Sequence, residues 1–272
     1  MSGGGETAFR VRDVFYRYHQ VPALNGLAMQ VVRGERVALL GSNGSGKSTL
    51  LRLLAGLAFA ERGDISFFGE PLTERNFQDE AFFFHFRRRV GLVFQNPDVQ
   101  LFNPSVFDEV AFGPLQLRWP KAKIREIVES ALESMGISHL RDRAPHRLSG
   151  GEKKRVALAS VLVTDPEVLL LDEPSAALDP LSQAQILSLL ASWKNGVKTV
   201  ITATHDLDTL EEIADRCYVF QAGRIAGEGT PLEVLHDVAL LERTGLVRVH
   251  EHVHETDDSP HPHPHLHRHD TH

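Results

Sequence analysis

A glycine-rich loop between an apolar run and a helix-like stretch places the strongest constraint on how this chain folds. The loop spans residues 41–49 and reads Gly-Ser-Asn-Gly-Ser-Gly-Lys-Ser-Thr. Residues 36–40 before it are mostly apolar and predict a buried strand, whereas residues 46–57 predict a helix. Strand, glycine loop and helix form half of a βαβ unit, and further apolar runs alternate with helical patterns downstream. The sequence therefore predicts an α/β fold with a mostly parallel sheet.

The residue types in this loop suit phosphate binding. Glycines let the backbone curl so that successive N–H groups point at phosphate oxygens, and the following helix adds its positive N-terminal end. The loop matches the pattern G-x-x-x-x-G-K-[ST], in which the lysine reaches the β- and γ-phosphates and the next hydroxyl binds Mg²⁺. A chance glycine loop is the alternative, and the flanking strand and helix argue against it. The candidate nucleotide-binding residues are Gly41, Ser42, Asn43, Gly44, Ser45, Gly46, Lys47, Ser48 and Thr49.

A second motif adds the groups that hydrolysis needs. Residues 168–171 form an apolar run that is followed by Asp172 and Glu173. A carboxylate at the end of a strand can hold Mg²⁺ through water, and the carboxylate beside it can polarise the attacking water. An acid-rich turn is the alternative, and without Lys47 it would be the better one. With both motifs present, we expect ATP hydrolysis with Ser48 and Asp172 at the Mg²⁺ ion.

A third motif, Ser149-Gly-Gly-Glu, begins 102 residues after Lys47 and 23 residues before Asp172. Taken alone it is an ordinary helix cap. Its place between the two nucleotide motifs makes the chain resemble the ABC ATPases over residues 9–242. In that family this signature binds the γ-phosphate of the ATP that the opposite subunit holds. The resemblance therefore implies a homodimer that closes over two ATP molecules, with Ser149, Gly150, Gly151 and Glu152 completing each site.

Other positions match the family one by one. The resemblance implies that Tyr18 stacks on adenine, although a half-buried strand tyrosine is the alternative. It implies that Gln95 senses Mg²⁺ and the attacking water, and that Asp179 lies in the loop that crosses the dimer interface. His205 matches the histidine that contacts the γ-phosphate, and it lies at a strand's end, the edge where α/β sheets bind ligands. Together with Glu173, Gln95 and His205 form the predicted catalytic set.

The same resemblance implies the domain organisation. It predicts a P-loop NTPase of the ABC ATPase type, with a RecA-like parallel-sheet core, an N-terminal antiparallel β subdomain and an inserted helical subdomain over about residues 96–165. The nucleotide-binding domain is expected over residues 1–247. Residues 248–272 are expected to form a disordered histidine-rich tail, because their composition changes abruptly and prolines are interleaved.

Residues 94–102, Phe-Gln-Asn-Pro-Asp-Val-Gln-Leu-Phe, narrow the resemblance. They resemble the ATP-binding component of energy-coupling-factor importers, especially the cobalt and nickel importers of the CbiO/NikO group. In those proteins this segment receives helices of a membrane subunit, which implies a transmission surface over about Asp98 to Phe107. Leu101 and Phe102 would suit such a contact if exposed, and burial within the helical subdomain is the alternative. A vitamin importer of the same group, or a soluble ABC protein of DNA repair or translation, remain competing functions.

Composition restricts the partners. No stretch approaches the ~20 apolar residues of a membrane-spanning helix, so we expect a peripheral protein at the cytoplasmic face of the membrane. Five of the 36 acids and one of the 29 bases lie from His250 onward, which leaves the body a net charge of −3. A nearly neutral body argues against nucleic acid as a partner. The single cysteine, Cys217, excludes an intrachain disulfide.

The tail has a pattern of its own. Nine of the 15 histidines lie in the last 23 residues, mostly at i, i+2 spacing, which puts side chains on one side of an extended chain. Neutral imidazole binds Ni²⁺, Co²⁺, Cu²⁺ and Zn²⁺, so the tail is a candidate nickel or cobalt site, with a solvated tail or an artificial tag as the alternatives. The candidate ligands are His250, His252, His254, His261, His263, His265, His267 and His269.

Overall fold

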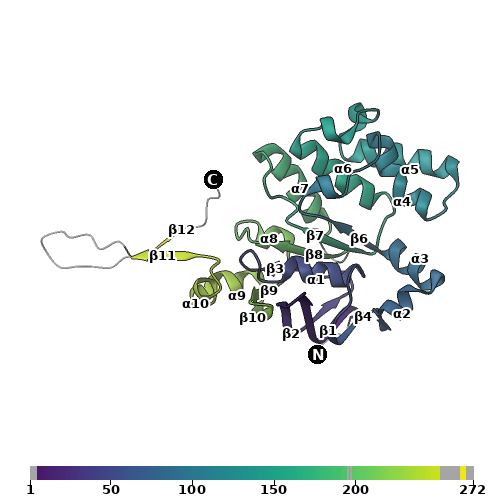
Figure 1. Cartoon of the computed structure of the whole chain (residues 1–272). Helices are drawn as coiled ribbons and strands as arrows, with labels where there is room; N and C mark the ends of the chain where they lie inside the picture. Colours follow the sequence, from purple (N-terminus) through teal and green to yellow (C-terminus); the bar gives the residue numbers. More distant parts are fainter. Residues whose placement is uncertain (1–4, 195, 197, 252–263, 268–272) are drawn as a thin grey trace, which may run out of the picture.

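The computed structural model describes residues 5–194, 196, 198–251 and 264–267, and Figure 1 shows their arrangement. The first part of the chain forms a four-stranded antiparallel sheet with the strand order β2-β1-β4-β5. Its strands are β1 (Thr7–Tyr18), β2 (Val21–Val32), β4 (Arg62–Phe67) and β5 (Glu70–Pro71). Period-2 burial in β1 and β2 turns one face of this sheet toward the core. This is the N-terminal antiparallel subdomain that the sequence predicted.

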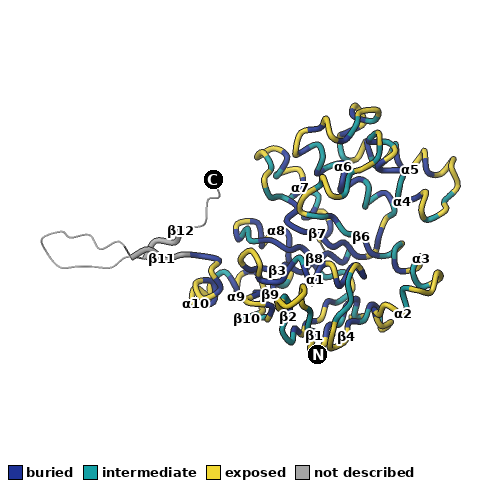
Figure 2. The backbone as a smooth tube through the Cα atoms, in the orientation of Figure 1, coloured by how far each residue is buried: buried dark blue, intermediate teal, exposed yellow. Residues whose placement is uncertain are grey.

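A six-stranded sheet forms the centre of the molecule, in the order β10-β9-β3-β8-β7-β6. Its strands are β3 (Arg36–Leu40), β6 (Val90–Val93), β7 (Val168–Asp172), β8 (Thr199–Thr204), β9 (Arg216–Gln221) and β10 (Arg224–Gly229). Every neighbouring pair is parallel except β9 with β10. All residues of β3, β7 and β8 are buried, as expected for parallel strands covered on both faces (Figure 2).

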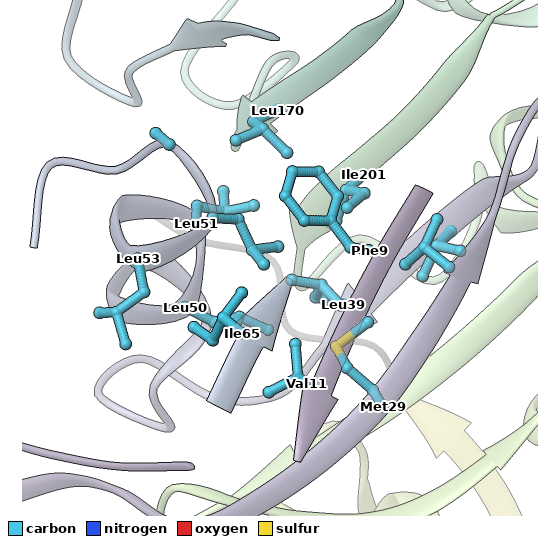
Figure 3. Close-up of a cluster of buried hydrophobic side chains, with 14 of the residues drawn as sticks. Phe9, Val11, Met29, Leu39, Leu50, Leu51, Leu53, Ile65, Leu170 and Ile201 are labelled. Atoms are coloured by element: carbon cyan, nitrogen blue, oxygen red, sulfur yellow. The ribbon is translucent and has the colours of Figure 1, made fainter. Parts of the chain in front are cut away.

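Helix α1 (Lys47–Leu54) follows the glycine loop and lies between the two sheets. Its leucines pack with residues of the antiparallel sheet, such as Phe9 and Val11, and with Leu39 and Ile201 of the parallel sheet (Figure 3). A single helix thus carries apolar contacts to both sheets, and it fixes the loop at its N-terminus relative to the rest of the core.

Helices cover the remaining surfaces in two groups. The cluster made mainly by α4 (Val106–Gln116), α5 (Lys121–Ser134) and α6 (Gly150–Leu162) runs from Val106 to Val163 and forms a separate apolar core. The other face of the parallel sheet is covered by α7 (Pro180–Ser192), α8 (Leu210–Ile213), α9 (Pro231–His236) and α10 (Val238–Arg243). Short 3-10 turns at Pro97–Val99, Ser138–Leu140 and Pro145–Arg147 connect the helical group. The predicted bounds of the helical subdomain, residues 96–165, enclose its apolar core.

The segment between β4 and β6 contains two helices that the sequence analysis did not predict. They are α2 (Glu74–Phe77) and α3 (Glu80–Arg89). A usable signal was Asp79, whose side chain accepts a hydrogen bond from the backbone N–H of Phe82 and so caps α3. The run of phenylalanines in α3 hid the helical period, because four of the five residues 82–86 are phenylalanine and show no spacing.

Two short strands lie within the predicted tail. β11 (Arg248–Glu251) and β12 (Pro264–His267) pair antiparallel, with Val249 opposite Leu266 and His250 opposite His265. An i, i+2 alternation is also the period of a strand, and this accounts for the pairing. The prediction for residues 252–263 and 268–272, which include His252, His254, His261, His263 and His269, lies outside the described residues.

None of the helices in the described ranges is both long and apolar enough to cross a membrane.

The only cysteine provides a test of the packing of β9. Cys217 is fully buried, and burial raises the pKa of its thiol to about 12. Because thiolate is the reactive form, we expect a thiol reagent at pH 8 to label the native chain at least about 100-fold more slowly than the chain in guanidinium. The measurement is the rate of iodoacetamide labelling by mass spectrometry. Equal rates in the two states would contradict this packing.

Candidate active site

The glycine loop connects the end of β3 to the start of α1. Gly41 and Gly46 have φ of 149° and 112°, and a Cβ at either would lie 2.7 Å from a backbone carbonyl, that of Phe220 or Ala23. These two glycines are therefore required by the local backbone. Gly44 also has a positive φ, but its surroundings are open, and it lies with Ser42 and Asn43 on the exposed side of the loop.

Lys47 is buried inside this loop. Its Nζ donates hydrogen bonds to the carbonyls of Gly41 at 2.6 Å and Ser42 at 3.2 Å. Burial lowers the pKa of its ammonium, and the charges of Glu173 and Asp172 oppose that shift. The loop thus holds a cation close to two carboxylates, at the place where the motif pattern puts the terminal phosphates.

The hydroxyl of Ser48 and the carboxylate of Asp172 meet at the junction of α1 and β7. Ser48 Oγ donates to Asp172 Oδ1 at 3.0 Å, and burial raises the pKa of Asp172. A hydroxyl and a carboxylate oxygen in contact form the hard oxygen donor set that Mg²⁺ prefers. The residues present therefore fit a Mg²⁺ ion bound with nucleotide. Gln95, the third predicted ligand, is exposed just after β6.

Glu173 and His205 are in direct contact. His205 Nδ1 lies 2.9 Å from Glu173 Oε1, although the two residues follow different strands, β7 and β8. Glu173 has a left-handed backbone, with φ of 46°, and its N–H donates to the carbonyl of Ala203. A non-glycine residue in this conformation stores strain of the kind found at functional sites. The sequence predicted both residues as catalytic, but it did not predict their contact.

The signature motif forms the exposed start of α6. Ser149 and Glu152 make a capping box, in which the hydroxyl of Ser149 accepts from the N–H of Glu152 and the carboxylate of Glu152 accepts from the N–H of Ser149. The hydrogen bond from the backbone N–H of Ser149 lowers the pKa of the Glu152 carboxyl. The structure thus uses Glu152 to cap its own helix. Within the described ranges, no hydrogen bond joins residues 149–152 to the loop at residues 41–49.

The two glycines of the signature have different surroundings. A Cβ at Gly151 would lie 2.5 Å from Ser182 Oγ and 3.4 Å from Asp179 Oδ2, so the contact of α6 with α7 requires a glycine there. A Cβ at Gly150 would meet nothing within 4 Å, and its φ is not left-handed. The fold of this chain alone therefore gives no reason for a glycine at position 150.

Two further predicted residues lie at the edges of the site. Asp179 caps α7 by accepting from the N–H of Ser182, and its pKa is lowered by the side-chain and backbone hydrogen bonds of Ser182. Tyr18, at the end of β1, is half-exposed, and its hydroxyl accepts a hydrogen bond from Arg52 of α1. An exposed ring beside the helix that follows the glycine loop is compatible with adenine stacking.

The sequence analysis missed one buried residue near the site. Lys154 of α6 is 2% exposed, and its Nζ donates to the carbonyls of Phe94 at 3.2 Å and Gln95 at 2.9 Å. Burial lowers the pKa of this ammonium to about 8, against the charges of Asp172 and Glu173. The available signal was its helical spacing with the buried Gly151 and Leu158, which places a charge on the inner face of α6.

The segment after Gln95 has both exposed and buried apolar residues. Phe102 is 67% exposed and its ring packs edge-on against Phe112, and Val99 is similarly exposed. Leu101, by contrast, is partly buried against the apolar cores on both sides. Of the two alternatives that the sequence left open, exposure therefore holds for Phe102 and partial burial for Leu101, because Leu101 lies where the helical subdomain meets the parallel sheet.

Comparisons with known proteins agree with this geometry. The family model for ABC transporters matches residues 24–176. The nickel import ATP-binding protein NikO of Rhodobacter capsulatus is 58% identical over 243 residues, which cover 88% of this chain and 96% of NikO. The energy-coupling factor transporter ATP-binding protein EcfA of Methanothermobacter thermautotrophicus is 44% identical, over 87% of this chain and 75% of EcfA. The structure of CbiO1 from Clostridium perfringens, part of the ABC transporter complex CbiONQ, has a TM-score of 0.74 and 39% identity, covering 89% of this chain and 95% of CbiO1.

This chain therefore belongs to the ABC transporter family, and the predicted ABC ATPase fold is confirmed. The narrower resemblance to the ATP-binding component of energy-coupling-factor importers in the CbiO/NikO group is confirmed as well.

The position of Lys47 leads to a test of nucleotide binding. Lys47→Ala removes the only ammonium that the glycine loop itself carries, and with it charge-assisted bonds to phosphate. A loss of about 1.5–3 kcal/mol corresponds to an ATP affinity lower by roughly 10- to 150-fold. Titration calorimetry with Mg·ATP measures the dissociation constant of each variant. Lys198→Met serves as the control, because Lys198 binds Asp165 and Pro166 in another part of the chain; equal affinity of the Lys47→Ala variant and the unaltered chain would contradict the assignment.

Proposed function

We propose that this chain is the ATP-hydrolysing subunit of an importer for nickel or cobalt ions and that it works as a homodimer closing over two ATP molecules. The observation that carries the hydrolytic part is the contact of buried Glu173 with His205, beside the pair formed by Ser48 and Asp172. The cargo rests on the similarity to the nickel import protein NikO over most of both chains. Import of the metal would be coupled to ATP hydrolysis. The complex of this chain with the membrane subunits of the importer would then be a translocase.

The chain's own groups account for the steps of hydrolysis. Lys47 holds the terminal phosphates, and Glu173, a buried carboxylate, accepts hydrogen bonds from the attacking water and takes up its proton. His205 orients Glu173 through Nδ1 and presents its half-exposed ring toward the γ-phosphate. Mg²⁺, when bound with ATP, neutralises charge that develops on the phosphates. Gln95 lies at the end of the neighbouring strand β6 and orients the water from the other side.

The dimer is proposed from the signature. Ser149 and Gly150 present an exposed helix start, which attracts an anion through the N–H groups that follow Ser149, whose own N–H donates to Glu152. The open space at Gly150 has no function in the fold of a single chain, but it allows close approach by a phosphate that another subunit brings. Asp179 lies next to Gly151 and so at the same surface. Each ATP is then held by residues 41–49 of one subunit and residues 149–151 of its partner.

The transmission surface is proposed over residues 98–107. It presents Asp98, Val99 and Phe102 to solvent, and Glu109 fixes its backbone by accepting from the N–H groups of Phe102 and Asn103 at 2.8 Å. A firm loop with an exposed aromatic ring suits docking of a helix from a membrane subunit. The proposal includes a position at the cytoplasmic face of the membrane, reached through this membrane subunit, and it includes no role for nucleic acid.

Glu173→Gln separates ATP binding from hydrolysis. Glutamine keeps the shape but cannot accept the proton, so kcat should fall by on the order of 100-fold or more. Mg·ATP should then trap a dimer, which size-exclusion chromatography with light scattering detects. Hydrolysis by Glu173→Gln at the rate of the unaltered chain would show that another group is the base.

Nickel or cobalt binding by the tail is a second part of the proposal. Among the residues that the structure describes, no group of three or more His, Cys, Asp or Glu side chains could hold a metal ion, so the tail is the candidate that the sequence offers. Imidazole ligands favour Cu²⁺ over Ni²⁺ whatever their role, so binding alone does not identify the cargo.

Deletion of residues 249–272 tests the role of the tail. If the tail supplies metal to the importer, uptake of ⁶³Ni at limiting concentration should fall, while ATPase activity of the isolated chain stays within about twofold because the nucleotide site lies elsewhere. A variant with all tail histidines changed to asparagine is the matched control for length. Unchanged uptake by both variants would exclude a necessary role.

A vitamin importer of the same group remains the competing function. Growth of a deletion strain distinguishes the two: rescue by added nickel or cobalt supports the metal importer, and rescue by a vitamin alone contradicts it.

A further inference from the structure

Three side chains connect α6 to the segment that follows β6. Lys154 donates to the carbonyls of Phe94 and Gln95, as described above. Lys153 forms an ion pair with Asp98 at 2.7 Å. Gln100 reaches back in the other direction, because its Nε2 donates to the carbonyl of Ala157 at 3.0 Å.

Lys154 is the buried member of this set. A buried ammonium is costly unless hydrogen bonds and opposite charges surround it. Two carbonyls at the end of β6 supply acceptors, and Asp172 and Glu173 at the end of β7 supply negative charge. Lys154 therefore joins a helix of the helical subdomain to the carboxyl edge of the central sheet.

Gln100 binds the other end of the segment that follows β6, residues 94–100, to α6. Its Oε1 accepts from the N–H of Phe94 at 3.3 Å, and its Nε2 also donates to Ser160 Oγ at 3.1 Å. Residues 94–100 are thus bound to α6 at both ends, through Lys154 near the start of the helix and through Gln100 near its end. The hydrogen bonds leave the Gln95 side chain itself exposed.

We propose that Lys154 is a positioning residue that locks the Gln95 segment to α6, so that the glutamine at the nucleotide site and the signature at the start of α6 move as one rigid body. The inference rests on the proposed ATPase function for the role of Gln95 and of the signature. Gly150 precedes Lys154 by four residues, or about 6 Å along the helix axis. A displacement at Gln95 therefore reaches the signature through one helical turn.

The hydrogen bonds of Lys154 and Gln100 also link Gln95 and the signature to the transmission surface. Asp98 lies within the segment that Lys154 and Gln100 hold, and Phe102 follows it directly. A push on that surface would move residues 94–100 together with α6. Nucleotide occupancy and membrane-subunit position then act on the same helix, with no flexible link between them.

Lys154→Met and Lys154→Gln test the proposal. Methionine fills the same volume without any donor, whereas glutamine retains an N–H donor without the charge. We expect Lys154→Met to lower kcat by on the order of tenfold or more, while ATP affinity, measured with Glu173→Gln also present, changes by less than about threefold. Lys154→Gln should recover the rate to within about threefold of the unaltered chain.

Lys198→Met is the matched control. Lys198 is also a largely buried lysine that donates to a backbone carbonyl, that of Pro166, but it does so outside the nucleotide site. The Lys198→Met variant should have a kcat within about twofold of that of the unaltered chain. An unchanged kcat in Lys154→Met, equal losses in Lys154→Met and Lys154→Gln, or a similar loss in Lys198→Met would each overturn the proposal.

Hydrogen exchange keeps the proposal testable even if Lys154→Met does not fold. In the Glu173→Gln chain titrated with ATP, peptides covering residues 94–101 and 149–157 should gain protection with the same midpoint. Separate midpoints would overturn the rigid connection. Failure of the unaltered chain to hydrolyse ATP would instead count against the proposed function, and the exchange midpoints would still decide the inference on Lys154.

Discussion

Two buried ammonium groups, each held by backbone carbonyls near the carboxylates at the end of β7, form the constraint on which the arrangement of this site depends. Lys47 enters from the glycine loop and Lys154 from α6, while Asp172 and Glu173 end the central strand β7. Burial opposes the charge on each lysine, and the carboxylates oppose that effect. Charges removed from water persist only when they are balanced and hydrogen-bonded. The glycine loop and the helical subdomain therefore each bring a buried ammonium, held by backbone carbonyls, near the carboxylates that follow the central strand.

This balance explains why the site can respond to nucleotide. ATP and Mg²⁺ bring new charges next to groups that are already desolvated, where electrostatic interactions are stronger than in water. In the proposed mechanism, Lys47 exchanges its loop carbonyls for phosphate acceptors, whereas Lys154 keeps its bonds to the segment that carries Gln95. The response therefore reaches α6, and with it the exposed signature that the fold of one subunit leaves without a ligand.

Much of the fold and most of the site follow from the sequence, for identifiable reasons. Residues 41–49 could be identified from the sequence as a phosphate-binding loop, because glycine, lysine and serine at this spacing between a strand and a helix rarely serve another function. Residues 168–173 could be identified because four consecutive apolar residues followed by two carboxylates form a recognisable strand end. The contact between Glu173 and His205 was not predictable, since it depends on β7 and β8 being neighbours in the sheet. Lys154 was missed because a charged residue in an amphipathic helix normally faces solvent, and α3 because its phenylalanines conceal the period.

The central claim is that each ATP site is completed by a second copy of the chain, and a mixing experiment measures this directly. Lys47→Ala impairs the glycine loop and leaves the signature intact, while Gly150→Glu blocks the signature in a position with open space and leaves the loop intact. Each variant alone should be nearly inactive. The account predicts that an equimolar mixture hydrolyses ATP several-fold faster than the sum of the two, because mixed dimers contain one complete site. A mixture no faster than that sum would contradict it.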